Sequence, residues 1–363
     1  EFWARLTFFL DETKARDIIP QFTLWDQHDL KLWHKIPWNP HNNINFDEND
    51  LPDSKEFCNT VVKNNKKVLY YQNKFIERLM SVTLRYNHVL YNINNESWAG
   101  IEWENYWAKK IKELAHEQQS EIEVTTMHMY PSSTVRSFFE YGELYSFVDI
   151  SQINQDSKGE KGQAHWDALM AMRNIIHTKS PVPMNNEKIY GNHEQINRKT
   201  IQYNTSAGTR GEAVERFWRD IFGGCAAVRF HRPQSWGMGL CDTSMIQLKA
   251  LDMLVEKLNV FECSPCNELL KNRKENSAYC FANIGSQYAI YFPKEGAVDF
   301  DPWVTRDGLS LTWLHIDECK WLKQENMSVQ WELAKNDYKI NGTVSLKTPG
   351  TGSWIALIEA KNE

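Results

Sequence analysis

Two glutamates stand at the ends of apolar runs, where their carboxyl groups could take part in catalysis. Glu96 ends the run at 90–96 and Glu187 ends the run at 181–187, and each follows two asparagines. One carboxylic acid of such a pair can protonate a glycosidic oxygen while the other attacks the anomeric carbon or activates water. The two groups must then differ in protonation state. The alternative is that both glutamates are ordinary caps of the helices that follow.

The segments that must position these glutamates alternate between apolar strands and helices. Strands are expected at 18–26, 88–94, 121–130, 144–152, 181–187 and 225–233, and helices at 68–86, 101–118, 165–177, 211–224 and 242–259. Repeated strand–helix units with apolar strands predict a parallel sheet covered by helices. In this count Glu187 lies three strands after Glu96.

The pattern changes near residue 277. Beyond it, short alternating runs are divided by Gly, Pro, Asn and Asp, which predicts an antiparallel β-sandwich. We therefore expect a (β/α)₈-barrel domain at 1–270 and a β-sandwich domain at 277–363. The segment at 26–67 is long for a connection, and long ordered loops are usually functional.

Other polar and aromatic residues cluster at the inferred strand ends. Catalytic groups of a (β/α)₈ barrel sit at the carboxyl ends of its strands, and Trp faces stack on sugar rings. The expected substrate-binding residues are Asn95, Trp25, Asp26, Trp38, Trp98, His128, Tyr130, His165, Arg229, His231, Arg232 and Trp236. His128 and Tyr130 could instead form only the cleft wall, and His165 could cap a helix.

Composition excludes some classes of function. The chain has 363 residues and a formal net charge of −6, so no basic face is expected for nucleic acid. No apolar run reaches the length of about 18 residues that a membrane span needs. The 15 Trp residues fit either a sugar-binding cleft or a Trp-rich core. Cys263 and Cys266 form a lone C-x-x-C, so we expect no metal and no cofactor. The oligomeric state is left open.

Several stretches resemble known glycosidases. NINNES resembles the Asn-Glu strand-end motif of clan-A glycoside hydrolases, and residues 2–26 and 223–233 resemble cellulase-like (β/α)₈ barrels. Residues 278–301 and 346–360 are similar to a small domain that carries a collagen-binding label. The resemblance implies retaining hydrolysis of an oligo- or polysaccharide, with Glu96 as acid/base and Glu187 as nucleophile. It also implies a secreted or periplasmic protein.

The same resemblance assigns Glu96 to the fourth barrel strand. The run at 18–26 would then be the third, and the first two strands are expected upstream of Glu1. A barrel incomplete in this way leaves two alternatives open. The protein could bind glycan without cleaving it, or it could act in surface adhesion.

The last predicted strand carries a cluster of basic residues. Side chains alternate along a strand, so Arg229 and His231 should face the same side. Arg229 could pair with Glu187 and keep it ionised, or hold an acidic group of the substrate. Arg232 is expected to bind uronic or sulfated glycans in either case.

Overall fold

The computed structural model describes residues 1–152, 161–189, 209–230, 242–303, 308–327, 330–333 and 340–360. The chain forms two compact units. The first comprises residues 1–153 and 173–185, and the second comprises residues 154–172 and 186–363. Each unit is described by itself.

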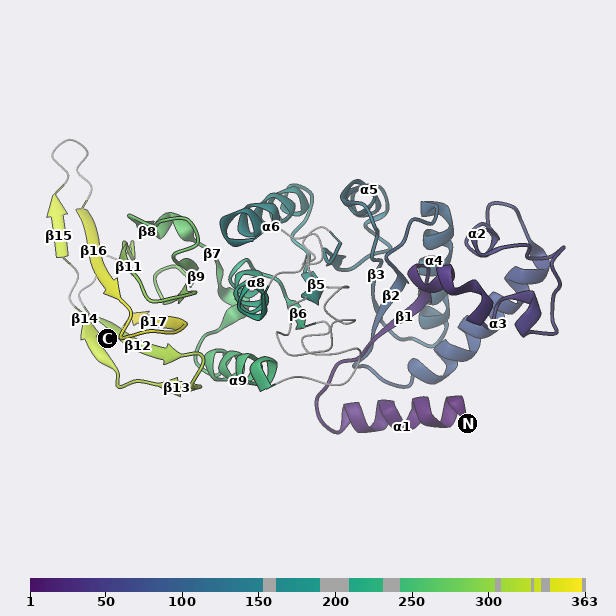
Figure 1. The fold of residues 1–363 in the computed structure, drawn as a ribbon, viewed down its shortest axis with the longest axis horizontal. Coiled ribbons are helices and arrows are strands. Elements are labelled where there is room, and N and C mark those ends of the chain that lie inside the picture. Colours follow the sequence, from purple (N-terminus) through teal and green to yellow (C-terminus); the bar gives the residue numbers. More distant parts are fainter. Residues whose placement is uncertain are drawn as a thin grey trace. The chain divides into compact units, whose positions relative to one another are not determined.

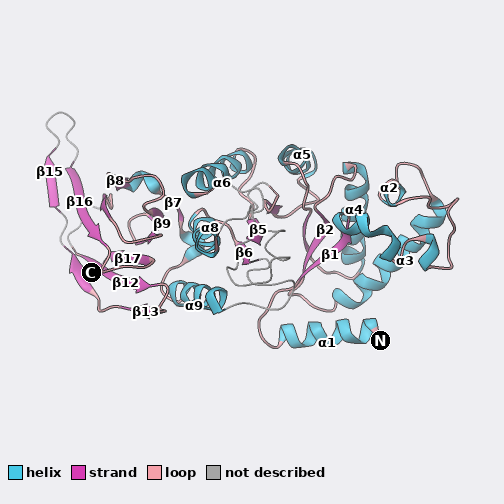
Figure 2. Ribbon diagram, in the orientation of Figure 1, coloured by secondary structure: helices cyan, strands magenta, loops and turns pink. Residues whose placement is uncertain are grey.

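The first unit contains a parallel sheet of three strands. β1 (Gln21–Asp26), β2 (Leu90–Asn95) and β3 (Glu123–Thr125) lie in the order β1-β2-β3, and Figures 1 and 2 show how the helices lie around them. Parallel pairing brings the carboxyl ends of neighbouring strands to one edge of the sheet. Asp26 pairs with Asn95 at that edge, and Glu96 follows directly.

Helices connect these strands. α3 (Lys66–Thr83) precedes β2, α4 (Ile101–Glu117) leads from β2 to β3, and α5 (Pro131–Tyr141) follows β3. The sequence pattern does not predict α5, although Pro131 suits the first turn of a helix. The remaining helices of this unit are α1 (Phe2–Lys14), η1 (His28–Lys35), η2 (Pro40–Asn42) and α2 (Ser54–Phe57).

An aromatic cluster fills the core between β1, α2, α3 and α4. Its centre is Trp25, whose ring lies 5.0 Å from Trp107, 5.5 Å from Phe57 and 5.7 Å from Trp103. Trp103 and Trp107 are fully buried one helical turn apart on α4. Much of the Trp content of this unit therefore serves packing.

A second sheet, in which β4 and β5 pair in parallel, follows in the chain. β4 (Val148–Asp149), β5 (Met184–Ile189) and β6 (Ala227–Phe230) lie in the order β4-β5-β6. β5 and α6 (Gly162–His177) each contribute residues to both units. Along the chain β5 is the third strand after β2, as the sequence predicts. Glu187 lies within β5, however, and not at its end.

The second unit joins two helices to antiparallel sheets. α8 (Arg210–Phe222) and α9 (Asp242–Val255) share a hydrophobic core with β9 (Tyr279–Asn283) and β10 (Gln287–Phe292). One sheet has the order β13-β12-β17-β10-β9-β7, with β14 paired to β12, and the other has the order β15-β16-β11-β8. This part of the chain confirms the predicted antiparallel sheets.

The remaining elements of the second unit are short, apart from three longer strands. They are η4 (Val260–Glu262), β7 (Ser264–Pro265), η5 (Asn267–Leu269), β8 (Leu270–Lys271), β11 (Ala297–Phe300), β12 (Leu309–His315), β13 (Lys320–Trp321), β14 (Glu325–Met327), β15 (Gln330–Leu333), β16 (Ile340–Lys347) and β17 (Trp354–Ala360). α8 and α9 pack on the antiparallel sheets, so the two compact units are not divided at residues 270–277. The predicted domain boundary between residues 270 and 277 stays a prediction.

Candidate active site

Glu96 lies in a turn that interrupts the pairing of β2 with the chain after β3. We call residues 94–98 the Glu96 turn. The Asn94 carbonyl accepts a hydrogen bond from the Met127 N–H at 3.1 Å, and the Ser97 N–H donates to the Met127 carbonyl at 2.8 Å. Asn95 and Glu96 are the residues between these two bonds. Glu96 has a φ of 48°, a left-handed conformation that is costly for a residue with a side chain and persists only where its surroundings hold it.

Hydrogen bonds of buried side-chain amide and hydroxyl groups hold the Glu96 turn in place. The Asn94 side chain accepts from the Gln27 N–H at 3.0 Å and donates to Ser97 Oγ at 3.0 Å. Gln27 Oε1 accepts from Ser97 Oγ at 3.1 Å and from the Trp98 N–H at 2.8 Å. Gln27, Asn94 and Ser97 are all buried, so these bonds are shielded from water. They link the residue after β1 to both sides of Glu96.

One imidazole approaches the Glu96 carboxyl group. His28 Nε2 lies 3.5 Å from Glu96 Oε2, and the Glu96 side chain is only 13% exposed. Lys31 Nζ lies 2.8 Å from the same ring nitrogen, while Asp29 Oδ1 lies 3.2 Å from Nδ1. Our sequence reasoning missed His28, although it stands two residues after the predicted strand end at Asp26.

Asp26 and Asn95 are joined at the same edge of the sheet. The Asn95 side-chain amide donates to Asp26 Oδ1 at 2.8 Å, and the bond is exposed. Both residues were predicted substrate ligands, and the structure places them side by side next to Glu96. An exposed pair of this kind offers both hydrogen-bond donors and acceptors to a sugar hydroxyl.

A second glutamate lies buried beneath the turn. Glu104 on α4 is fully buried, and its Oε2 lies 3.1 Å from Nδ1 of the buried His128. Burial raises the pKa of Glu104 to about 8, an effect that Ser97, Thr126 and Asn94 partly offset. Burial also lowers the pKa of His128 to about 4. Near pH 7 both side chains are therefore neutral: the Glu104 carboxyl group is protonated and the His128 imidazole is uncharged.

His128 requires a correction. We expected it at the cleft surface, but it is 3% exposed and its Nε2 lies 2.7 Å from Ser137 Oγ. The cavity beside it has a volume of about 10 Å³, room for at most one water molecule. In this conformation His128 supports the strand ends from within and does not reach a sugar.

The aromatic candidates divide into buried and exposed residues. Trp25 is 4% exposed at the centre of the aromatic cluster, so its predicted contact with sugar is wrong for this conformation. Trp38 is half-buried and packs on Trp25 and Phe57. Trp98 and Tyr130 are 53% and 58% exposed. Among the aromatic candidates that the structure describes, Trp98 and Tyr130 are therefore the two that are exposed, as stacking on a sugar requires.

Glu187 has its own set of neighbours in the second unit. The preceding residue, Asn186, is buried and donates from its side chain to Asp220 Oδ2 at 2.9 Å. The Arg229 Nε donates to the backbone carbonyl of Glu187 at 3.4 Å. β5 is therefore tied to α8 on one side and to β6 on the other, which fixes the backbone that carries Glu187.

His165 also requires a correction. It is fully buried, accepts at Nδ1 from Arg219 Nε at 3.3 Å, and has Nε2 3.9 Å from Asp220 Oδ1. Burial, with Arg219 and Arg216 nearby, holds the pKa of His165 well below its usual range. It is a neutral member of the network behind β5 and not a ligand over a cleft. His231, Arg232 and Trp236 lie outside the described residues.

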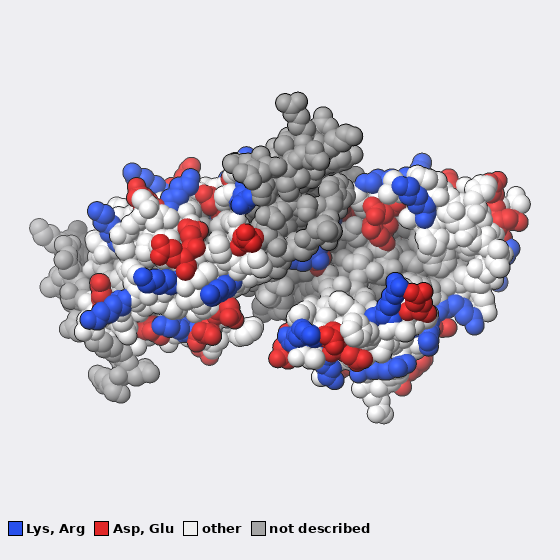
Figure 3. All heavy atoms as spheres, turned by 60° about the horizontal axis from the view of Figure 1, so that its bottom comes forward, with Lys and Arg blue, Asp and Glu red and all other residues white. Residues whose placement is uncertain are grey.

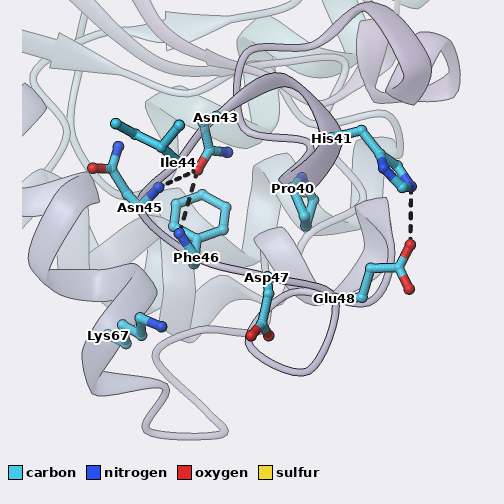
Figure 4. A pocket seen from close by; sticks show the side chains of 9 residues that line it. All are labelled: Pro40, His41, Asn43, Ile44, Asn45, Phe46, Asp47, Glu48 and Lys67. Atoms are coloured by element: carbon cyan, nitrogen blue, oxygen red, sulfur yellow. Dashed lines mark hydrogen bonds and ion pairs between the residues drawn. The ribbon is translucent and has the colours of Figure 1, made fainter.

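A surface hollow in the first unit is a weaker candidate site. Its volume is about 390 Å³, and Figure 4 shows it lined by Pro40, His41, residues 43–48 and Lys67. Asn43 Oδ1 accepts from the backbone N–H groups of Asn45 and Phe46, and His41 pairs with Glu48 at 2.9 Å. These groups stabilise the loop itself, so the hollow offers few of them to a ligand.

Surface charge and possible metal-binding groups can be compared among the described residues. On the face drawn in Figure 3, Lys and Arg side chains lie among Asp and Glu side chains. Within the described ranges, no three His, Cys, Asp or Glu residues are grouped to hold a metal ion. In the same part of the chain, none of the helices has the length and apolar character to cross a membrane.

Comparisons with known proteins establish the fold. No protein-family model matches the chain, and no curated protein matches it significantly. A solved structure described as a glycoside hydrolase aligns with 99% of this chain and 90% of its own, with a TM-score of 0.61 and 11% identity. A glycoside hydrolase family 5 protein from Bacteroides vulgatus ATCC 8482 aligns with 99% of this chain and 86% of its own, also with a TM-score of 0.61 and 11% identity.

At this identity the likeness shows a TIM-barrel-type α/β fold with antiparallel sheets, in agreement with the predicted class. Neither description mentions a collagen-binding domain, so that part of the resemblance stays a prediction.

Proposed function

We propose that this protein is a retaining glycoside hydrolase in which Glu96 is the acid/base and Glu187 is the nucleophile. One observation carries the proposal. Glu96 is a partly shielded carboxyl group at the carboxyl end of a parallel strand, in a left-handed turn that buried hydrogen bonds hold in place. The ends of parallel strands are where barrel enzymes carry their catalytic groups. The shared fold with solved glycoside hydrolases supports the same reaction class.

In this mechanism Glu96 first protonates the glycosidic oxygen and later removes a proton from the attacking water. A general acid needs a position within hydrogen-bond reach of the leaving group. The Glu96 side chain is 13% exposed, and His28 Nε2 lies 3.5 Å from Glu96 Oε2. His28 is therefore within reach of the carboxyl group that would transfer the proton.

Glu187 would attack the anomeric carbon and form the covalent intermediate. Support comes from its place three strands after Glu96 along the chain and from the fixed backbone of β5. Retention requires carboxyl groups about 5–5.5 Å apart. The stereochemical outcome of hydrolysis therefore reports on the spacing of the two catalytic carboxyl groups.

The proposed substrate is an oligo- or polysaccharide. Trp98 and Tyr130 present exposed rings in the same unit as Glu96, and the Asp26–Asn95 pair lies beside it. Degradation of such substrates normally takes place outside the cytoplasm. A secreted or periplasmic location is therefore part of the proposal, and cell fractionation tests it.

The experiment compares Glu96→Gln and Glu187→Gln on aryl glycosides that differ in leaving-group pKa. Loss of an acid/base costs about 10²–10⁴-fold in rate. We expect Glu96→Gln to lose that factor on poor leaving groups and much less on activated ones, because these need no protonation. Glu187→Gln should lose activity on all of them. NMR of the first-formed sugar then reports retention or inversion.

Glu102→Gln is the matched control, because Glu102 is exposed on the same helix as Glu104 and close in sequence to Glu96. It should hydrolyse the substrates as the wild type does. Equal loss on good and poor leaving groups in Glu96→Gln would refute the acid/base role. Glycan binding by the wild type without hydrolysis of any substrate would instead support the non-catalytic alternative.

A further inference from the structure

The residue of interest is Glu104, which lies under the Glu96 turn without being part of it. It is fully buried on α4, and neither of its oxygens accepts a hydrogen bond of normal geometry from the described residues. A carboxylate in such a place is costly, whereas a neutral acid is far less so. Polar groups of Ser97, Thr126 and Asn94 lie near the carboxyl group and offset only part of the cost of burial, so burial dominates and favours the protonated side chain.

The groups around Glu104 belong to the residues that flank Glu96. Asn94 and Ser97 face its carboxyl group from the turn, while Thr126 and His128 face it from the chain that follows β3. The other titratable neighbours are the buried Cys58 and Tyr145, whose pKa values are raised by burial and by Glu104. Among the described residues, no Lys or Arg forms an ion pair with Glu104.

We propose that Glu104 is a positioning residue for Glu96, because the Glu96 turn stays closed only while the Glu104 carboxyl group is neutral. This proposal rests on the proposed function for the role of Glu96, but the mechanical coupling does not. The link is the hydroxyl group of Ser97, which has one proton to donate. In the structure that proton goes to Gln27 Oε1, at 3.1 Å.

Ionisation of Glu104 changes this distribution of hydrogen bonds. A carboxylate is a stronger acceptor than an amide oxygen, so it competes for the Ser97 hydroxyl proton and the Asn94 amide. The Ser97 hydroxyl then leaves Gln27, whose side chain also holds the Trp98 N–H at 2.8 Å. The turn loses hydrogen bonds on both sides of Glu96, and its left-handed backbone has less to hold it.

Amide hydrogen exchange tests the coupling without any substrate. The Ser97 and Trp98 amides of the turn donate to the Met127 carbonyl and to Gln27 Oε1, so their protection reports whether the turn is closed. After correction for the intrinsic rate, we expect wild-type protection at these amides to fall about tenfold from pH 7 to pH 9. Glu104→Gln should keep its protection at both pH values, and the control Glu102→Gln should behave as the wild type.

A measurement on the wild type alone keeps the test decisive if Glu104→Gln does not fold. The carboxyl carbon of Glu104 should titrate near pH 8, and the Ser97 and Trp98 amide resonances should shift with the same midpoint. Independent midpoints, or equal pH dependence in wild type and Glu104→Gln, would overturn the proposal.

The pH dependence of kcat provides a separate test of the proposal. In an active enzyme, Glu104→Gln should lose the fall in kcat on the alkaline side of pH 8 that the wild type shows, while KM is unaffected. Because exchange and titration need no hydrolysis, they can support the coupling even if the proposed function fails. An active enzyme whose alkaline limb is the same in Glu104→Gln would count against the positioning role.

Discussion

The buried carboxyl group of Glu104 makes a quantitative prediction about global stability. Its pKa is about 8 in the folded protein against an ordinary value of 4.5. A group with a raised folded pKa gives stability that is fully present below its unfolded pKa and is lost as the pH rises through the folded value. The free energy of unfolding should therefore fall between about pH 4.5 and pH 8.

The magnitude follows from the pKa difference. One pKa unit corresponds to about 1.4 kcal/mol, and Glu104 is still mostly protonated at pH 7. Between pH 7 and pH 9 its contribution should fall by about 1.4 kcal/mol. The neutral isostere Glu104→Gln has no such loss, so the stability difference between wild type and variant should change by that amount.

His128 determines the pH range of the measurement. Its pKa is lowered to about 4, so its contribution is lost as the pH falls from 6.5 towards 4, in the opposite direction. Below pH 6.5 the two groups partly cancel. Above pH 7 the His128 contribution is constant and the Glu104 effect stands alone.

The assay is urea unfolding at pH 7 and pH 9, followed by Trp fluorescence and by circular dichroism, on wild type, Glu104→Gln and Glu102→Gln. Burial, which is the larger cause of the raised Cys58 pKa, is the same in all three proteins, so the Cys58 titration largely cancels in the difference. Parallel pH dependence of wild type and Glu104→Gln would show that Glu104 is already ionised at pH 7 and would refute the reasoning.

Three further predictions concern packing, capping and substrate charge. Trp25→Ala should lower the free energy of unfolding in urea by about 3–5 kcal/mol, because the ring is buried in the aromatic cluster. Trp98→Ala should change the free energy of unfolding by less than about 0.5 kcal/mol and weaken glycan binding. A Trp25→Ala variant of unchanged stability with a raised KM would contradict the packing role of Trp25. Thr209→Ala should cost about 1 kcal/mol, since Thr209 and Glu212 form a capping box at the start of α8; an unchanged unfolding midpoint would contradict it. Arg232→Ala should lower kcat/KM for uronic or sulfated glycans more than for neutral ones, and equal losses on both would disprove the role.

The order of the elements could be read from the sequence because it depends on local patterns. Apolar runs of strand length and helical spacing of apolar residues predicted β1, β2 and β5, and the helices α3, α4 and α6, to within a few residues. The strand expected at 121–130 is shorter in the structure, where β3 ends at Thr125. Beyond it, His128 forms an isolated parallel bridge with Ser97. α5 escaped prediction, although its Pro131 was a usable signal.

The chemistry of the Glu96 turn depended on sequence and tertiary structure in different ways. The sequence placed Glu96 at the end of one strand and Asp26 at the end of another, and parallel pairing brings these ends to one edge. It could not show the left-handed backbone at Glu96 or the Gln27 side chain that holds Trp98, since Gln27 and Trp98 are distant in sequence and meet only through strand pairing.

Burial is the property that only the tertiary structure decided. Trp25, His128 and His165 are residue types that serve clefts and cores equally, and neighbours contributed by other elements placed all three inside. Glu104 gave one local signal, because it lies four residues before the buried Ala108 and seven before the buried Ile111, on the apolar face of α4. Its raised pKa required more than that pattern. It depends on which groups of the turn and of the chain after β3 surround the carboxyl group, and folding alone brings those groups together.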